Sequence, residues 1–90
     1  MTEAMLSIIT ESADNITKMN TDPFDQKLAE SYINDALSRL QSSCELSKNE
    51  AVDQLCDAFA RLKDDGKFDE HPNLFSAFTI LKRIRSESGS

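Results

Sequence analysis

The chain has 90 residues, of which 39% are hydrophobic, and its 16 acidic and 10 basic side chains give a formal net charge of −6. This length suits one small domain with a single core and leaves little room for a deep substrate pocket, which argues against an enzyme. The acidic balance repels phosphate backbones over most of the surface, so nucleic acid is disfavoured as a partner.

Neither secretion nor membrane insertion is predicted. The N-terminus carries the acidic residue Glu3 in place of an apolar signal segment, and no apolar run is long enough to span a membrane. Cys44, Cys56 and the single histidine His71 cannot supply four zinc ligands without help from carboxylates. We therefore expect reduced thiols in a cytoplasmic protein, with no metal and no cofactor.

The first half of the chain predicts two amphipathic helices, over residues 3 to 19 and 23 to 43. Apolar side chains recur there at three- and four-residue steps, which places them on one stripe of each helix. Pro23 suits a first helical position, so Thr21 or Asp22 is expected to cap the second helix. The first stripe contains Met5, Leu6, Ile8, Ile9, Ala13, Ile16 and Met19. The second contains Phe24, Leu28, Ala29, Tyr32, Ile33, Ala36, Leu37 and Leu40.

The second half predicts helices over residues 48 to 63 and 72 to 85. Ser47 and Glu50 have the spacing of a capping box, and Gly66 suits a left-handed residue after the third helix. Residues 64 to 71 are expected to form a loop, and Pro72 to open the last helix. The third stripe contains Ala51, Val52, Leu55, Cys56, Phe59 and Leu62. The fourth contains Leu74, Phe75, Ala77, Phe78, Leu81 and Ile84.

These elements predict an all-α fold, a small antiparallel four-helix bundle. Two short links and one of about eight residues favour antiparallel neighbours. Residues 1 to 85 are expected to form a single helical domain, followed by a disordered C-terminal tail over residues 86 to 90.

Half of the acidic residues lie between positions 45 and 70, which makes this the densest carboxylate segment of the chain. Such a run is often only a solvated face, but it also suits electrostatic docking of a basic protein. Phe68 lies among these acids and either anchors a partner or folds back as a plug on the bundle end. The predicted partner-binding residues are Glu50, Asp53, Asp57, Asp64, Asp65, Phe68, Asp69 and Glu70.

The leading hypothesis is a non-enzymatic, acidic protein–protein interaction module that inhibits or regulates a partner by covering its basic surface. Immunity proteins, antitoxins and phage regulators are analogous in size, charge and helicity, but the chain shows no family motif. No nucleophile, base and orienting group can be paired by spacing, so no catalytic residue is predicted.

Two alternatives remain open. In the first, a transcriptional or nucleic-acid regulator docks through the basic end of the last helix, at Lys82, Arg83 and Arg85. In the second, surplus apolar surface on the first helix forms a homodimer, which is compatible with either function.

Overall fold

The computed structural model describes residues 3 to 20 and 23 to 88, and this part of the chain contains five helices and no strand. The helices are α1 (Glu3–Thr17), α2 (Gln26–Ser43), α3 (Lys48–Asp64), α4 (Lys67–Glu70) and α5 (Pro72–Ser88).

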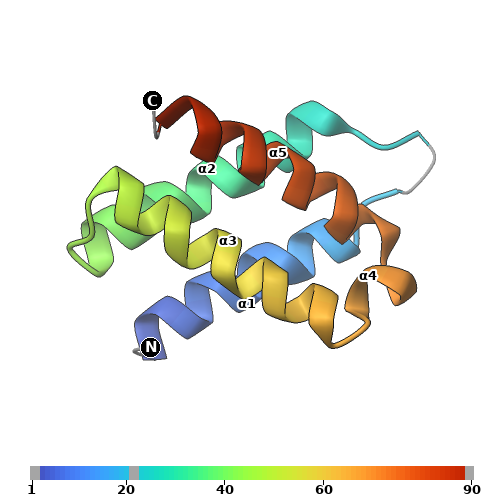
Figure 1. The fold of residues 1–90 in the computed structure, drawn as a ribbon, viewed down its shortest axis with the longest axis horizontal. Helices are drawn as coiled ribbons and strands as arrows, with labels where there is room; N and C mark the ends of the chain where they lie inside the picture. Colours follow the sequence, from blue (N-terminus) through green and yellow to red (C-terminus); the bar gives the residue numbers. More distant parts are fainter. Residues whose placement is uncertain (1–2, 21–22, 89–90) are drawn as a thin grey trace.

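The four long helices form two antiparallel pairs (Figure 1). Helix α1 packs mainly against α2, and α3 mainly against α5, while α2 also contacts both α3 and α5. The short helix α4 packs mainly against the ends of α3 and α5, so it closes one end of the bundle. The predicted all-α antiparallel four-helix bundle is confirmed, with α4 as an addition.

One core runs through the bundle and receives large side chains from every long helix. Phe59 and Leu55 of α3, Ile16 of α1, Ile33 of α2 and Leu81 of α5 are all fully buried. Along each long helix the buried residues recur at steps of three or four, as on α2, where Ala29, Ile33, Ala36, Leu37 and Leu40 are buried. This amphipathic stripe explains why these segments form helices that pack on one another.

Helix α2 begins three residues later than predicted. Asp25 is its N-cap: the side-chain Oδ1 accepts a hydrogen bond of 3.0 Å from the Leu28 backbone N–H. The prediction of a start at Pro23 was wrong because a better-placed acceptor follows the proline. Thr21 and Asp22, the predicted caps, lie outside the described residues. Helix α1 ends at Thr17, two residues before its predicted end.

The start of α3 is as predicted. The Ser47 hydroxyl accepts from the Glu50 backbone N–H at 3.2 Å, and the Glu50 carboxylate accepts from the Ser47 backbone N–H at 3.1 Å. This reciprocal pair satisfies two donors that a helix start leaves open. Gly66 has the expected left-handed conformation, with φ of 81°.

The segment predicted as a loop, residues 64 to 71, contains α4. The chain turns at Gly66 and immediately forms one helical turn, closed by a 2.9 Å hydrogen bond from the His71 backbone N–H to the Lys67 carbonyl. Beyond it, α5 continues to Ser88 instead of ending at residue 85, so the helix includes residues 86 to 88 of the predicted tail. Residues 89 and 90 of the predicted tail lie outside the described residues.

Three side chains predicted to be in the core are exposed: Leu6 by 56%, Leu28 by 39% and Phe75 by 58%. Each borders an apolar stripe without facing its centre. On α5 the buried stripe includes Leu74, Ala77 and Ile80, and Phe75 follows Leu74 by about 100° around the helix axis. Ile80 takes a core position that the sequence reasoning missed.

Candidate functional site

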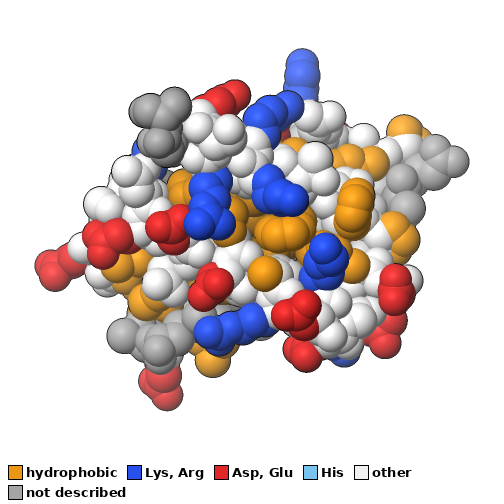
Figure 2. All heavy atoms as spheres, viewed as in Figure 1, with side chains coloured by type: hydrophobic (Ala, Val, Ile, Leu, Met, Phe, Trp, Pro, Cys, Tyr) orange, Lys and Arg blue, Asp and Glu red, His pale blue; other side chains and the backbone are white. Residues whose placement is uncertain are grey.

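The predicted acidic residues divide between two places. Asp53 and Asp57 are exposed on α3, with Glu50 in its first turn, whereas the other carboxylates lie where α3 ends and α4 begins. Figure 2 shows the face made by α3 and α5, where acidic and basic side chains alternate around apolar ones. The α3 side of the predicted site is therefore not one continuous acidic surface.

Basic neighbours compensate the carboxylates along α3. Asp53 Oδ1 lies 3.2 Å from Arg85 Nε on α5, and Asp57 Oδ2 lies 4.0 Å from Arg61 Nη2 one turn further along α3. All four side chains are at least 60% exposed, so each pair contributes only about 0 to 1 kcal/mol of stability. The pairs still reduce the negative electrostatic potential around Asp53 and Asp57, because each carboxylate has a cation beside it.

Glu50 has a structural role as the last member of the capping box. The hydrogen bond from the Ser47 backbone N–H, followed by that with the Ser47 side chain, holds the pKa of the Glu50 carboxyl below its ordinary value. A carboxylate near the N-terminus of α3 also suits the helix dipole. Its presence in the sequence is therefore explained by helix formation alone.

We call the remaining carboxylates, Asp64, Asp65, Asp69 and Glu70, the acidic end. All four residues are exposed, and Glu70 Oε2 lies 3.5 Å from Lys67 Nζ. Asp64 is the last residue of α3 and Asp65 is its C-cap. Negative charge at a helix C-terminus opposes the helix dipole, at a cost of about 0.3 to 1 kcal/mol for each charge.

Phe68 is 8% exposed and acts as a plug on the bundle end, which is one of the two predicted outcomes. Its ring makes edge contacts with Phe75 and Phe78 of α5, at centroid distances of 6.3 and 5.6 Å. These contacts fix α4 to α5 and hold the carboxylates of α4 in place. Phe68 is therefore not available as an exposed anchor, which corrects its inclusion among the partner-binding residues.

The three basic residues of α5 all have neighbours within the protein. Arg83 Nη2 lies 2.6 Å from Glu30 Oε1 on α2, and Arg85 binds Asp53 as described above. Lys82 Nζ lies 5.5 Å from the centre of the Phe78 ring, within cation–π range. A phosphate would have to compete with these contacts.

Both thiols are free, Cys44 half-buried and Cys56 buried. Burial raises the pKa of the Cys56 thiol, whose sulfur lies 3.9 Å from the Leu81 carbonyl oxygen. His71 is exposed at the junction of α4 and α5. Within residues 3 to 20 and 23 to 88, no group of three His, Cys, Asp or Glu side chains is arranged to hold a metal ion. No helix in this part of the chain is both long and apolar enough to cross a membrane.

Two features were missed by the sequence reasoning. Asn73 is 3% exposed, and its Nδ2 donates to the Ile16 and Met19 carbonyls at 3.2 and 2.8 Å, tying the start of α5 to the end of α1. An apolar groove of about 400 Å³ lies between α1 and α3, beside the exposed Leu6. The only sequence signal for the role of Asn73 was its position directly after a helix-opening proline. The groove had no sequence signal, because α1 and α3 are far apart in the chain.

Comparisons of this chain with protein-family models, with curated proteins and with solved structures found no match. The geometry of the acidic end, the basic residues of α5 and the α1–α3 groove is therefore the basis for the functional argument.

Proposed function

We propose that this protein is a non-enzymatic binding module that covers a basic surface of a partner protein through its acidic end, as an inhibitor or regulator of that partner. The observation that carries the proposal is the position of Asp64 and Asp65 at the C-terminus of α3, where the helix dipole disfavours them. The dipole of α3 does not favour acids there, in contrast to Glu50, whose role in the capping box explains it.

Electrostatic steering is the mechanism. Four carboxylates within seven residues create a local negative potential that accelerates encounter with a basic surface and disfavours acidic competitors. Within the acidic end, Glu70 has Lys67 beside it, whereas Asp64, Asp65 and Asp69 have no ion pair within the part of the chain that the structure describes. Asp53 and Asp57, which the sequence placed in the same site, have Arg85 and Arg61 beside them and, like Glu70, add less to this potential.

The anchoring of α4 supports the same proposal. Because Phe68 packs on Phe75 and Phe78, the carboxylates of Asp69 and Glu70 are carried by a helical turn that is already held in place. A preformed surface loses less conformational entropy on binding than a mobile loop with the same charges. The reduced thiols Cys44 and Cys56 suit a cytoplasmic setting for this interaction.

The nucleic-acid alternative is less well supported. Docking through Arg83 and Arg85 would require both side chains to leave Glu30 and Asp53, and the chain as a whole is acidic. A duplex-DNA mobility shift at low salt that Arg83→Glu and Arg85→Glu abolish would revive this alternative.

The test compares two variants with the same change in charge. One neutralises the acidic end (Asp64→Asn, Asp65→Asn, Asp69→Asn, Glu70→Gln), and the control neutralises four acids elsewhere (Asp35→Asn, Glu45→Gln, Asp53→Asn, Asp57→Asn). Each purified protein is immobilised on beads and incubated with a lysate of the source cells. The captured proteins are then quantified by mass spectrometry. Circular dichroism checks that both variants are folded.

We expect a basic protein to be captured by the native chain and the control but lost from the acidic-end variant. Its association rate with the native chain should fall steeply as ionic strength rises. Equal capture by all three proteins, or equal loss from both variants, would contradict a site localised at the acidic end.

A further inference from the structure

Phe75, near the start of α5, is the most exposed large apolar side chain in the part of the chain that the structure describes, at 58%. Its ring meets the ring of Phe68 edge-on, at a centroid distance of 6.3 Å and an interplanar angle of 88°. This contact helps to fix the exposed ring in one orientation. The sequence predicted Phe68 as the apolar anchor of the binding site, but the structure buries Phe68 and exposes the ring that Phe68 supports.

A pocket of about 270 Å³ lies beside Phe75, between the start of α2 and the outer side of α5. Its apolar lining comes from Phe24, Phe75 and Ile80. Arg83 also lines the pocket, but its Nη2 lies 2.6 Å from Glu30 Oε1, so its charge is compensated. Sites for small molecules usually measure roughly 300 to 1,000 Å³. This pocket is smaller, and its size suits a single inserted side chain.

The same end of the molecule has an acidic balance. Residues 64 to 78 contain the four acids of the acidic end and one base, Lys67, which gives a net charge of −3. Lys67 Nζ is itself 3.5 Å from the carboxylate of Glu70. Phe68 connects the two features, because its ring contacts Phe75 and the next residue in the chain is Asp69. A partner residue that enters the pocket therefore has carboxylates nearby, which basic neighbours would match.

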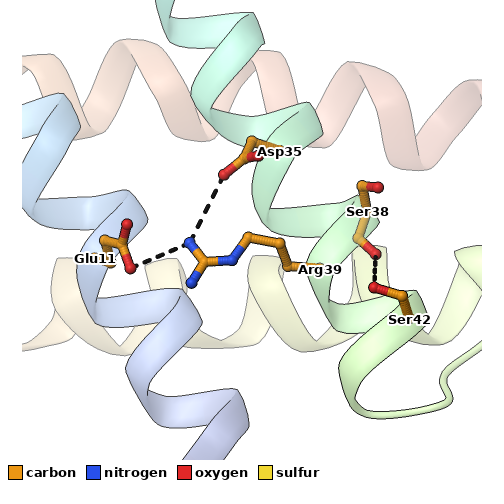
Figure 3. Close-up of polar contacts among 5 residues, drawn as sticks. All are labelled: Glu11, Asp35, Ser38, Arg39 and Ser42. Carbon is orange, nitrogen blue, oxygen red and sulfur yellow. Dashed lines mark hydrogen bonds and ion pairs between the residues drawn. The ribbon is translucent and has the colours of Figure 1, made fainter.

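Other surfaces match a basic partner less well. Arg39 Nη1 lies 3.1 Å from Glu11 Oε2 and 3.7 Å from Asp35 Oδ2, so a basic partner would have to compete with this arginine for both carboxylates (Figure 3). The lining of the α1–α3 groove includes Asp14 and Arg61, one charge of each sign. The acidic end, with four acids and one base, has the larger excess of negative charge.

We propose that the pocket beside Phe75 receives an aromatic side chain of the basic partner, from a segment that has lysine or arginine on both sides of that residue. The inference rests on the proposed function and adds an apolar anchor to it: the acidic end attracts the partner, and the pocket holds one of its side chains. The rings of Phe24 and Phe75 favour an aromatic occupant.

One interface is large enough to include both features. A standard protein interface covers about 800 Å² on each partner, which is roughly 30 Å across. The two longest dimensions of this molecule are 35 and 29 Å. A partner of ordinary size can therefore contact the acidic end and the pocket at the same time.

Three acetylated and amidated pentapeptides serve as defined probes: Lys-Lys-Phe-Lys-Lys, Lys-Lys-Ser-Lys-Lys and Ser-Ser-Phe-Ser-Ser. Each is titrated at low salt into the isotope-labelled full chain, and the amide NMR shifts give both the site and the dissociation constant. We expect the first peptide to bind roughly tenfold more tightly than either of the others, because only it has both the charges and the ring. The peptides with phenylalanine should shift residues 24 to 26 and 75 to 83, and those with lysine residues 64 to 70.

Three variants of the chain separate the two contributions. Phe75→Ala should weaken binding of Lys-Lys-Phe-Lys-Lys by roughly five- to tenfold and leave that of Lys-Lys-Ser-Lys-Lys unchanged, since the lost contact needs both rings. The acidic-end variant should weaken both lysine peptides by similar factors. Leu6→Ala is the matched control, because Leu6 is 56% exposed and lines the α1–α3 groove, and it should change neither affinity. Circular dichroism shows whether each variant is folded.

The pocket and the acidic end can fail separately in this experiment. Equal affinities of the native chain for the phenylalanine and serine forms of the lysine peptide would overturn the pocket proposal. Equal effects of Phe75→Ala and Leu6→Ala, or no binding of Lys-Lys-Phe-Lys-Lys at millimolar concentration, would do the same. If instead the acidic-end variant binds both lysine peptides as tightly as the native chain does, the proposed function fails, while the effect of Phe75→Ala still decides the pocket.

Discussion

The middle of the bundle and the end closed by α4 are each organised around a phenylalanine, but different contacts stabilise the two regions. Phe59 is fully buried among side chains from the long helices. Phe68 is 8% exposed and meets the edges of two other rings, one of which, Phe75, is largely exposed itself. The middle is thus stabilised by burial from all sides, whereas the α4 end depends on a few directed contacts.

Because of this difference, we expect the two regions to respond differently to the same substitution. A cavity in the middle cannot be filled by neighbours that are already packed on every side. The α4 end is one helical turn with solvent on one side, so it can shift to cover a smaller residue.

The largest effect is expected for Phe59→Ala, which should lower the free energy of unfolding by about 5 kcal/mol, at the upper end of the range for this change. Since a domain of this size has roughly 5 to 15 kcal/mol in total, the variant should be mostly or partly unfolded at 37 °C. Urea unfolding followed by far-UV circular dichroism measures the loss. Phe59→Leu keeps most of the volume and should retain a cooperative transition, and a loss below 1 kcal/mol for Phe59→Ala would contradict the comparison.

Phe68→Ala should cost less, about 3 kcal/mol, because the α4 end can relax. Phe68→Leu should cost about 1 kcal/mol, mainly through the lost ring-edge contacts with Phe75 and Phe78. The same urea titration applies to both variants. Phe75→Ala is the control, with a loss below that of Phe68→Leu, since Phe75 is mostly exposed.

Alkylation of Cys56 shows which region opens in each variant. Burial and a raised pKa keep this thiol protonated and slow to react in the native protein. Labelling by iodoacetamide, read by mass spectrometry, should remain slow in Phe68→Ala and become fast in Phe59→Ala. Equally fast labelling in both would mean that the middle and the end unfold as one unit.

Asn73→Ala should lower the free energy of unfolding by about 2 kcal/mol, because it leaves the Ile16 and Met19 carbonyls without the amide that joins them to α5. Hydrogen exchange should then be faster at the end of α1 and the start of α5 than in α3. Uniform acceleration over all helices would argue against this local role.

The smallest effect is expected for Ser12→Ala, and it has the opposite sign. Ser12 is 5% exposed, and its hydroxyl has no hydrogen-bond partner among the described residues. Removing a buried, unsatisfied hydroxyl should raise the free energy of unfolding by about 1 kcal/mol. Thr10→Ala, at an exposed position on the same helix, serves as the comparison in thermal unfolding, and a destabilised Ser12→Ala would mean that the hydroxyl is satisfied.

The sequence predicted those parts of the fold that depend on local patterns. The four apolar stripes and the capping box at Ser47 each involve residues within a few positions of one another, and the helices followed from them. Helix α4 was missed because four residues are too few to show a 3.6-residue period. The start of α2 was misplaced because three residues near Pro23 could serve as its cap.

The candidate site was predictable in composition but not in arrangement. Residue type alone located the carboxylates between positions 45 and 70. The contact of Asp53 with Arg85 compensates this acid, but it joins residues on two helices, so no local pattern could show it. For the same reason, the position of Asn73 after Pro72 could not show that its partners would be the Ile16 and Met19 carbonyls, more than 50 residues away.

Gly66 turns the chain from α3 into α4, and an added Cβ would meet no atom within 4 Å. Handedness, and not space, therefore restricts this position: L-alanine would bear about 1 kcal/mol of backbone strain at a φ of 81°. A D-amino acid would adopt the same backbone without strain. In a chemically synthesised chain, D-alanine at residue 66 should keep the acidic end in place and stabilise the turn, because it narrows the conformations open to the unfolded chain.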